Sequence, residues 1–338
     1  MTFEQFKDAC FKAALEKGCE NAEIYATSSD GFSVNVLKGE VEQYSVERRS
    51  GLNLRVLIDG KSGYAYTEVL EDPEDLVRHA MDNARVIENT DVNPMQGPSE
   101  YPEITEKENP VVDLPEDEKV ALAMQVEKDT LKADERVNRM EMSLVDTGVE
   151  KTHIYNTLGL QADREERYSY LVVEPILREG EEEHSSFAFQ FGPDIQNYDG
   201  TIREAIDDAL LEFHASTVPS GEYRILLRND AAGDLLAAFS SMFFAESVQK
   251  GLSLLKGKLG EEIASQAVTI VDDPFEKDYP RAFDAEGVPS VLTTVLENGV
   301  LKSYLYNLKS ALKDGVPSTS NAGRAGAASP VVTAPSNF

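Results

Sequence analysis

The chain of 338 residues is predicted to fold as an α+β protein, and two observations support this class. Over residues 1–217, short runs that alternate apolar and polar residues lie between segments with helical periodicity. Over residues 218–338, strand and turn signals dominate around one long apolar helix. We therefore expect an N-terminal mixed α/β domain and a β-rich C-terminal domain built around that helix. The boundary is placed at the break in composition formed by Val218-Pro219-Ser220-Gly221.

The first block predicts one helix and a meander of antiparallel strands. The helix is expected over residues 2–17, with Thr2 as its N-cap and Gly18 as its stop, because its apolar residues recur at helical spacing. The expected strands, joined by turns at 38–40 and 59–60, cover residues 22–26, 32–37, 41–47, 52–58 and 62–67.

Two further helices and a second set of strands follow. Asp72 and Pro73 mark a helix start, and Pro115 opens another helix. The stretch between these helices, residues 88–114, is rich in Pro, Glu and Asn and is expected to be a long surface connection. The remaining expectations are strands over 137–177 and 187–191, turns near 147–148 and 158–159, and a helix over 202–214.

The C-terminal block begins with a short strand that looks buried, residues 223–228. The long apolar helix is expected over residues 231–250. Further along, Asn298-Gly299 lies between alternating apolar runs and is a strong hairpin signal.

The charge of the chain excludes some classes of function. It has 61 acidic residues against 32 Lys and Arg, which gives a formal net charge of −29. Phosphate backbones and anionic lipid surfaces need clustered basic residues, so we expect neither a nucleic-acid partner nor a membrane partner. The start of the chain does not have the pattern of a signal peptide, and the two cysteines are too few for a disulfide framework. We expect a cytoplasmic protein in which Cys10 is a reduced core residue.

The histidines do not form a recognisable metal site. The four histidines are His79, His153, His184 and His214, and none lies in an HExxH or HExxxH frame. Each is interpreted as a structural or surface residue.

Other chemistries have no convincing set of residues. Ser240-Ser241 lies within an apolar helix rather than on a nucleophile elbow, and Cys10 has no basic neighbourhood. No phosphate-binding loop is present, since Gly251, Gly257 and Gly260 do not follow the dinucleotide-binding spacing. The acids Asp272, Asp273, Asp278 and Asp284 lack EF-hand spacing and are interpreted as loop acids rather than ligands of a cation. No catalytic, cofactor-binding or metal-binding residue is assigned.

Several stretches in succession resemble one known family. In the first domain these are Ser33-Val-Asn-Val-Leu-Lys-Gly-Glu and the block Gly51-Leu-Asn-Leu-Arg-Val, which is followed by Asp59-Gly60-Lys-Ser-Gly-Tyr-Ala. In the second they are Val268-Thr-Ile-Val-Asp-Asp and Leu296-Glu-Asn-Gly-Val-Leu-Lys-Ser-Tyr. This order resembles the TldD/PmbA family of gyrase modulators and metallopeptidases, and the C-terminal part is most similar to its PmbA branch, also called TldE.

The resemblance implies a fold, a reaction and partners. It implies an α+β first domain, a curved β-rich second domain, and dimers in which TldD-like and PmbA-like subunits cleave unfolded proteins or peptides. In TldD-like members an HExxxH helix holds zinc. Alignment from Gly233 places Ala237, Ala238 and Met242 at the positions of His, Glu and His, so zinc is expected in a TldD-like partner and no cofactor is expected in this chain. Relative to the family, the chain is expected to be incomplete beyond Phe338.

Three hypotheses for function remain. The first is a PmbA-like subunit of a cytoplasmic metalloprotease, with a TldD-like paralogue as partner, that itself has no zinc site. The second is a stand-alone metallopeptidase that uses other ligands, such as His153 and His184. The third is a binding or regulatory homodimer without proteolytic activity.

Overall fold

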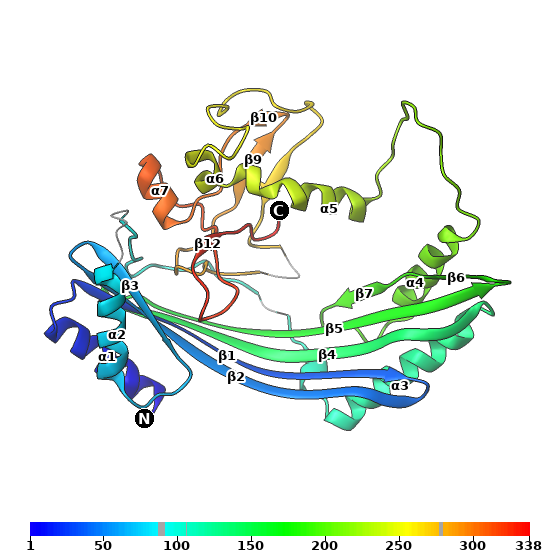
Figure 1. Ribbon diagram of the computed structural model, residues 1–338, viewed down its shortest axis with the longest axis horizontal. Coiled ribbons are helices and arrows are strands. Elements are labelled where there is room, and N and C mark those ends of the chain that lie inside the picture. The colour runs from blue at the N-terminus through cyan, green and yellow to red at the C-terminus, as the bar shows by residue number, and fades with distance from the viewer. Residues whose placement is uncertain (87–91, 106, 277–279) are drawn as a thin grey trace.

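The structure, a computed structural model, describes residues 1–86, 92–105, 107–276 and 280–338. It confirms the α+β class: seven α-helices of the described residues accompany one large, strongly curved antiparallel sheet (Figure 1). No helix within the described ranges is both long and apolar enough to cross a membrane.

The large sheet has seven strands in the order β3-β2-β1-β4-β5-β6, with β7 also paired to β5. Its strands are β1 (Asn21–Leu37), β2 (Glu40–Ile58), β3 (Lys61–Thr67), β4 (Val137–Asn156), β5 (Gln161–Glu179), β6 (Glu182–Ser185) and β7 (Ala188–Phe191). All of the pairings are antiparallel. Strand β4 has 20 residues, whereas strands of about 5–6 residues are usual.

These strands are longer than the sequence predicts. The strands expected at 22–26 and 32–37 form one strand, β1, and those expected at 41–47 and 52–58 form one strand, β2. The turn expected near 147–148 is also wrong, because Gly148 lies inside β4 opposite Gly31 of β1. Gly148 has no side chain, and this leaves room for the ring of Tyr168 from β5. A Cβ at position 148 would lie 2.5 Å from Tyr168 Oη. The predicted turns at 38–40 and 158–159 are confirmed.

A first helical layer covers the convex side of one end of the sheet. It consists of α1 (Phe3–Glu16) and α2 (Pro73–Val86), which share a core with β1 and β2 (Figure 1). Helix α1 begins as predicted: the Thr2 side chain accepts a hydrogen bond from the N–H of Gln5, and the Gln5 side chain accepts one from the N–H of Thr2. Cys10 is fully buried in this core as a free thiol, as predicted.

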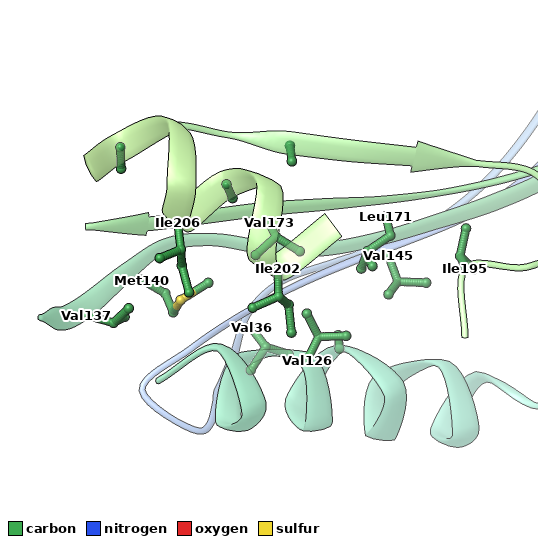
Figure 2. Packing of buried hydrophobic residues seen from close by; sticks show 14 of the residues in the cluster. Val36, Val126, Val137, Met140, Val145, Leu171, Val173, Ile195, Ile202 and Ile206 are labelled. Atoms are coloured by element: carbon green, nitrogen blue, oxygen red, sulfur yellow. The ribbon is translucent and has the colours of Figure 1, made fainter. Parts of the chain in front are cut away.

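A second helical layer covers the other end of the same sheet. Figure 2 shows α3 (Glu116–Ala133) and α4 (Asp199–Glu212) packed with the sheet around one apolar cluster. Val126 of α3 and Ile202 of α4 point toward each other, and both belong to the same cluster as Val173 and Val145 of the sheet. The short 3₁₀ helix η1 (Pro110–Asp113) leads into α3 and is the one regular element described in the predicted connection 88–114.

The C-terminal region packs over the concave side of the sheet, near the end that carries α1 and α2 (Figure 1). Its elements are α5 (Asn229–Phe239), η2 (Ser240–Phe243), α6 (Ala245–Gln249), β8 (Ile270–Asp272), β9 (Thr293–Glu297), β10 (Val300–Leu301), α7 (Leu308–Asp314), β11 (Ala322–Gly323) and β12 (Val332–Thr333). The hairpin predicted at Asn298-Gly299 is confirmed by the β9–β10 pairing. Its strands are short, however, and much of the region is irregular.

The single long helix predicted over 231–250 is wrong. The chain leaves the helical conformation at Phe244, whose φ and ψ are −75° and 124°. Backbone bonds to a distant segment cause this break, because Leu305 N–H donates to Phe243 O and Ala245 N–H donates to Leu305 O. Tertiary pairing therefore overrides helix propensity at this point.

Candidate functional site

Helix α5 carries two of the three positions that the resemblance aligns with the HExxxH motif. Ala237 and Ala238 lie on α5 and are exposed, and Met242 lies beyond its end in η2. An alanine side chain has no lone pair for a metal ion and no group that can accept a proton, and a thioether is a poor ligand for zinc. The residues present at these positions therefore do not fit a zinc ion.

The segment around α5 is far more exposed than the sequence predicts. Every residue from 214 to 235 is exposed, so the buried strand expected at 223–228 is wrong, and Leu226 is 97% exposed. Of the large apolar residues between 235 and 243 in the predicted helix, Leu235 and Phe239 are also exposed, Leu236 and Met242 are partly buried, and Phe243 is buried. This segment has an apolar composition but contributes little to any core.

The four histidines lie apart, each beside a carboxylate. His79 is on α2, 3.4 Å from Asp75, and His214 follows α4, 3.8 Å from Glu179. His153 of β4 lies with its Nδ1 2.5 Å from an Asp163 oxygen.

The two histidines considered as alternative ligands are far from each other. Along β5, His153 is paired opposite Asp163 and His184 is paired opposite Leu177, so 14 residues (163 to 177) separate the two positions. At a rise of about 3.3 Å per residue, this is roughly 45 Å along the strand. Zinc ligands lie about 2 Å from the ion, so His153 and His184 of one chain cannot hold the same ion.

A buried polar cluster joins the sheet to the segments that cover its concave side. Arg55 of β2 and Glu23 of β1 are directly opposite each other, with Arg55 Nη1 3.6 Å from Glu23 Oε1. The Arg55 guanidinium also donates to the backbone carbonyls of Asn93 and Pro94, which belong to the connection after α2. Asn156 of β4 donates through Nδ2 to Glu23 Oε2 at 3.3 Å. Neither the pair nor its partners follow from a sequence motif.

Two buried carboxyl groups of the C-terminal region form the other part of this cluster. Glu286 is 3% exposed and accepts a hydrogen bond from the backbone N–H of Leu308 at 2.8 Å. Burial raises its pKa, and the neighbouring Asp284 raises it further. Asp284 accepts three backbone N–H bonds, from Glu286, Val288 and Ala322, but its burial still raises its pKa.

The acids interpreted as loop residues have a structural role. Asp272 is 1% exposed and accepts hydrogen bonds from Asn321 Nδ2 and from both the N–H and the Oγ of Ser336. It therefore ties β8 to the last residues of the chain. Asp278 lies outside the described residues. Within the described ranges, no group of three or more His, Cys, Asp or Glu side chains is arranged to hold a metal ion.

The candidate nucleophiles are not activated. Ser240 Oγ donates to Ala237 O at 2.8 Å, as a helix-end hydroxyl commonly does. Burial raises the pKa of the Cys10 thiol to about 12, so the reactive thiolate is scarce at neutral pH. These groups support the fold rather than a covalent reaction.

Sequence comparison assigns almost the whole chain to known domains. Three domain models of the PmbA/TldA metallopeptidase match in succession: domain 1 over residues 22–84, the central domain over 109–212 and the C-terminal domain over 220–338. A solved structure from Thermotoga maritima, described as a candidate modulator of a DNA gyrase, is 35% identical and superimposes with a TM-score of 0.88. The match covers 96% of this chain and 76% of that one.

The chain belongs to the PmbA/TldD metallopeptidase family.

Curated relatives within the family carry the names of both branches. A metalloprotease of Methanothermobacter thermautotrophicus is 29% identical, over 94% of this chain and 71% of the relative. A Haemophilus influenzae PmbA homologue is 25% identical, over 91% of this chain and 70% of the relative, and a TldD homologue of the same organism is 26% identical. Overall identity therefore does not separate the two branches. The predicted division of this chain at 217/218 stays a prediction.

Proposed function

We propose that this chain is the PmbA-like subunit of a cytoplasmic two-subunit metalloprotease that acts on unfolded proteins or peptides. In this proposal, a TldD-like partner supplies the zinc ion, and the present chain helps to hold an extended substrate. One observation carries the proposal: Ala237, Ala238 and Met242 stand where the resemblance places the two zinc ligands and the general base.

The large sheet supports a role in holding substrate. Peptides can bind to sheet edges through backbone hydrogen bonds, which depend little on the side-chain sequence of the peptide. A subunit that supplies no zinc ligand can thereby still contribute to the cleavage of many different unfolded chains.

The test measures metal content and peptide cleavage for the chain alone, for a TldD-like protein alone, and for their mixture. We expect the chain alone to have no stoichiometric zinc and no activity, and the mixture to show both, together with coelution of the two proteins. Stoichiometric zinc and cleavage by the chain alone would overturn the proposal. In that case His153→Ala and His184→Ala variants would show whether either histidine is needed for the metal. A stable homodimer that never joins a TldD-like protein would favour a binding or regulatory role instead.

A further inference from the structure

A pocket of about 230 Å³ lies on the convex side of the sheet, beside the start of α1. Its apolar lining consists of Ala26 of β1, Leu52 of β2, Phe3 of α1 and Leu70. Ala26 and Leu52 belong to the core that the sheet shares with α1 and α2, and Phe3 and Leu70 pack against that core. The apolar part of the pocket is therefore built from well-packed elements.

One row of paired residues crosses the pocket from end to end. Thr67 of β3 is paired opposite Leu52 of β2. Leu52 is in turn opposite Ala26 of β1, and Ala26 is opposite His153 of β4. All four residues line the pocket. Three strand spacings separate β3 from β4, so the backbones at the two ends of the row lie about 14 Å apart. A ligand that contacts both ends must therefore be elongated.

His153 forms the β4 end of the pocket and offers a hydrogen-bond acceptor. Its ring lies 5.3 Å from the Phe3 ring, measured between centroids, and its Nδ1 lies 2.5 Å from a carboxylate oxygen of Asp163. The Tyr155 hydroxyl donates to the same oxygen. Because a carboxylate only accepts hydrogen bonds, Nδ1 carries the hydrogen, and Nε2 of the neutral ring is the acceptor. No residue that the structure describes forms a hydrogen bond with Nε2.

Glu68 forms the β3 end of the pocket and adds a negative charge. It directly follows Thr67, lines the pocket and is exposed. Its carboxylate accepts a hydrogen bond from the Tyr66 hydroxyl at 3.0 Å and forms no ion pair within the described ranges. This end of the pocket therefore favours a cationic group.

The cationic side chains near the pocket are already paired. Lys151 of β4 lies 3.0 Å from Glu165, and Arg48 of β2 lies 2.8 Å from Asp30. No Lys or Arg of the described residues lines the pocket itself. With a formal net charge of −29, the whole chain also attracts cations rather than anions.

The size of the pocket limits the ligand further. Pockets for drug-sized ligands usually have volumes of about 300–1,000 Å³, so this one suits a smaller molecule. The Phe3 ring in its wall favours an aromatic ring, which can pack against it edge-on or offset. A neutral acceptor such as His153 Nε2 does not offset the cost of removing a second cation from water. The donor at that end is therefore a neutral hydroxyl.

We propose that this pocket binds a small aromatic amine that carries a phenolic hydroxyl at the opposite end of its ring. The ammonium group donates to the Glu68 carboxylate, the ring packs among Phe3, Leu52 and Ala26, and the hydroxyl donates to His153 Nε2. The site lies on the side of the sheet opposite the C-terminal region. It is thus separate from the role in holding substrate that we propose for the subunit.

The test uses tyramine as the probe and the purified full chain as the protein. Calorimetry measures affinity, and NMR follows the four histidine Cε1–H signals during the titration. We expect a Kd on the order of 1 mM, which is reasonable for a ligand of this size. We also expect a shift of the His153 signal alone, since His79, His184 and His214 do not line the pocket.

Two analogues separate the contributions of the polar groups. Phenethylamine lacks the hydroxyl and should bind about fivefold more weakly, as expected for the loss of one hydrogen bond. 4-Hydroxyphenylacetate carries a carboxylate in place of the ammonium group. It should bind at least about tenfold more weakly, because Glu68 repels it.

Variants then locate the two contacts. Glu68→Gln should weaken tyramine binding about tenfold and reduce the preference over 4-hydroxyphenylacetate. His153→Phe keeps an aromatic ring beside Phe3 but removes Nε2, so tyramine and phenethylamine should then bind equally. Glu71→Gln is the matched control: it removes the same charge three residues from Glu68, at an exposed position that does not line the pocket, and should leave the affinity unchanged.

A peptide probe identifies the source of the ligand. Tyr-Gly-Gly amide has the same ring, hydroxyl and ammonium group at the N-terminus of a peptide. Tighter binding than tyramine would assign the site to a peptide N-terminus, and weaker binding would assign it to a free amine. Either result supports the site.

Several outcomes would overturn the inference. These are no binding of tyramine up to about 10 mM, equal binding of tyramine and 4-hydroxyphenylacetate, or an unchanged affinity in Glu68→Gln. A preference for tyramine over phenethylamine that persists in His153→Phe would also reject it. Because the assay needs neither zinc nor a TldD-like protein, its result leaves the test of the proposed function unaffected.

Discussion

Arg55 and Glu23 form an ion pair that is almost completely withdrawn from solvent, with each side chain 3% exposed and 3.6 Å between Arg55 Nη1 and Glu23 Oε1. The pair lies on adjacent strands, and its remaining polar atoms contact the 93–94 backbone and Asn156. Hydrogen bonds of this kind offset the cost of removing two charges from water. The pair therefore fixes which segments cover this end of the sheet.

Removal of one member of the pair should destabilise the fold strongly. We expect Arg55→Met to lower the free energy of unfolding by about 3–5 kcal/mol, because it leaves the Glu23 carboxylate buried without a counterion. Urea denaturation followed by circular dichroism measures this change. The double variant Glu23→Gln/Arg55→Met should cost less than the sum of the two single variants. Additive losses would show that the two side chains do not interact.

Glu286 should make stability depend on pH. Its pKa in the folded protein is raised above the ordinary value of 4.5, so the fold favours the protonated carboxyl. The stabilisation is complete below pH 4.5 and is lost as pH rises through the raised pKa. The wild-type protein should therefore lose stability relative to Glu286→Gln as pH increases from 5 to 8, by up to about 1.4 kcal/mol per pH unit.

Urea titrations of both proteins at several pH values measure this difference. Glu262→Gln, at an exposed position in the same region, is the control and should show no such trend. A difference between wild type and Glu286→Gln that stays constant with pH would contradict a raised pKa.

Gly148 should not tolerate a side chain while Tyr168 is present. A Cβ at this position would lie 2.5 Å from Tyr168 Oη, so Gly148→Ala must displace the ring. We expect a loss of about 1–3 kcal/mol, as for other overpacked sites. In a Tyr168→Ala background the same substitution should cost much less. An equal cost in both backgrounds would mean that the backbone, rather than the ring, requires glycine. Thermal denaturation of the four proteins distinguishes these cases.

The exposed segment before α5 should be the first site of limited proteolysis. All residues from 214 to 235 are exposed, and the strand expected at 223–228 does not form there. Cleavage needs an accessible backbone that can enter a protease cleft. We expect brief trypsin treatment to cut after Arg224 and leave fragments of 224 and 114 residues (338 − 224), identifiable by mass spectrometry. An Arg224→Gln variant should lose this cut. Initial cleavage within the α3 or α4 region would contradict the expectation.

Local sequence signals predicted the helix starts and tight turns well. Thr2 caps α1, Pro73 opens α2, and Asn298-Gly299 forms the hairpin, because each of these depends on residues within a few positions of one another. The long strands were not predicted, because Gly31 and Gly148 resemble turn residues locally. The requirement for glycine at 148 depends on the Tyr168 ring from β5, which a Cβ at that position would meet at 2.5 Å. The break of the predicted long helix at Phe244 has the same origin, since it depends on pairing with Leu305.

The polar cluster could not have been predicted from spacing. Glu23, Arg55 and Glu286 come from three separate parts of the chain and meet only through strand register and the packing of the C-terminal region. The absence of an HExxxH frame, in contrast, is visible in the sequence itself. The row formed by the exposed side chains of Phe187, Phe189 and Phe191 has a local signal, because these residues alternate as in a strand. Its exposure depends on which face the rest of the fold covers.

The uninterrupted strands also determine how the protein unfolds. The family's domain 1 and central domain match separate segments, yet β1 pairs with β2 on one side and with β4 on the other along most of its length. The helical layers at both ends therefore pack on the same strands. If the helical layer at one end of the sheet unfolds, the long strands lose part of their packing. The helical layer at the other end packs on the same strands and is therefore destabilised as well. Residues 1–213 should consequently denature in one cooperative transition, and a shortened chain that ends between α2 and α3 should fail to fold, although the family's domain boundary lies there.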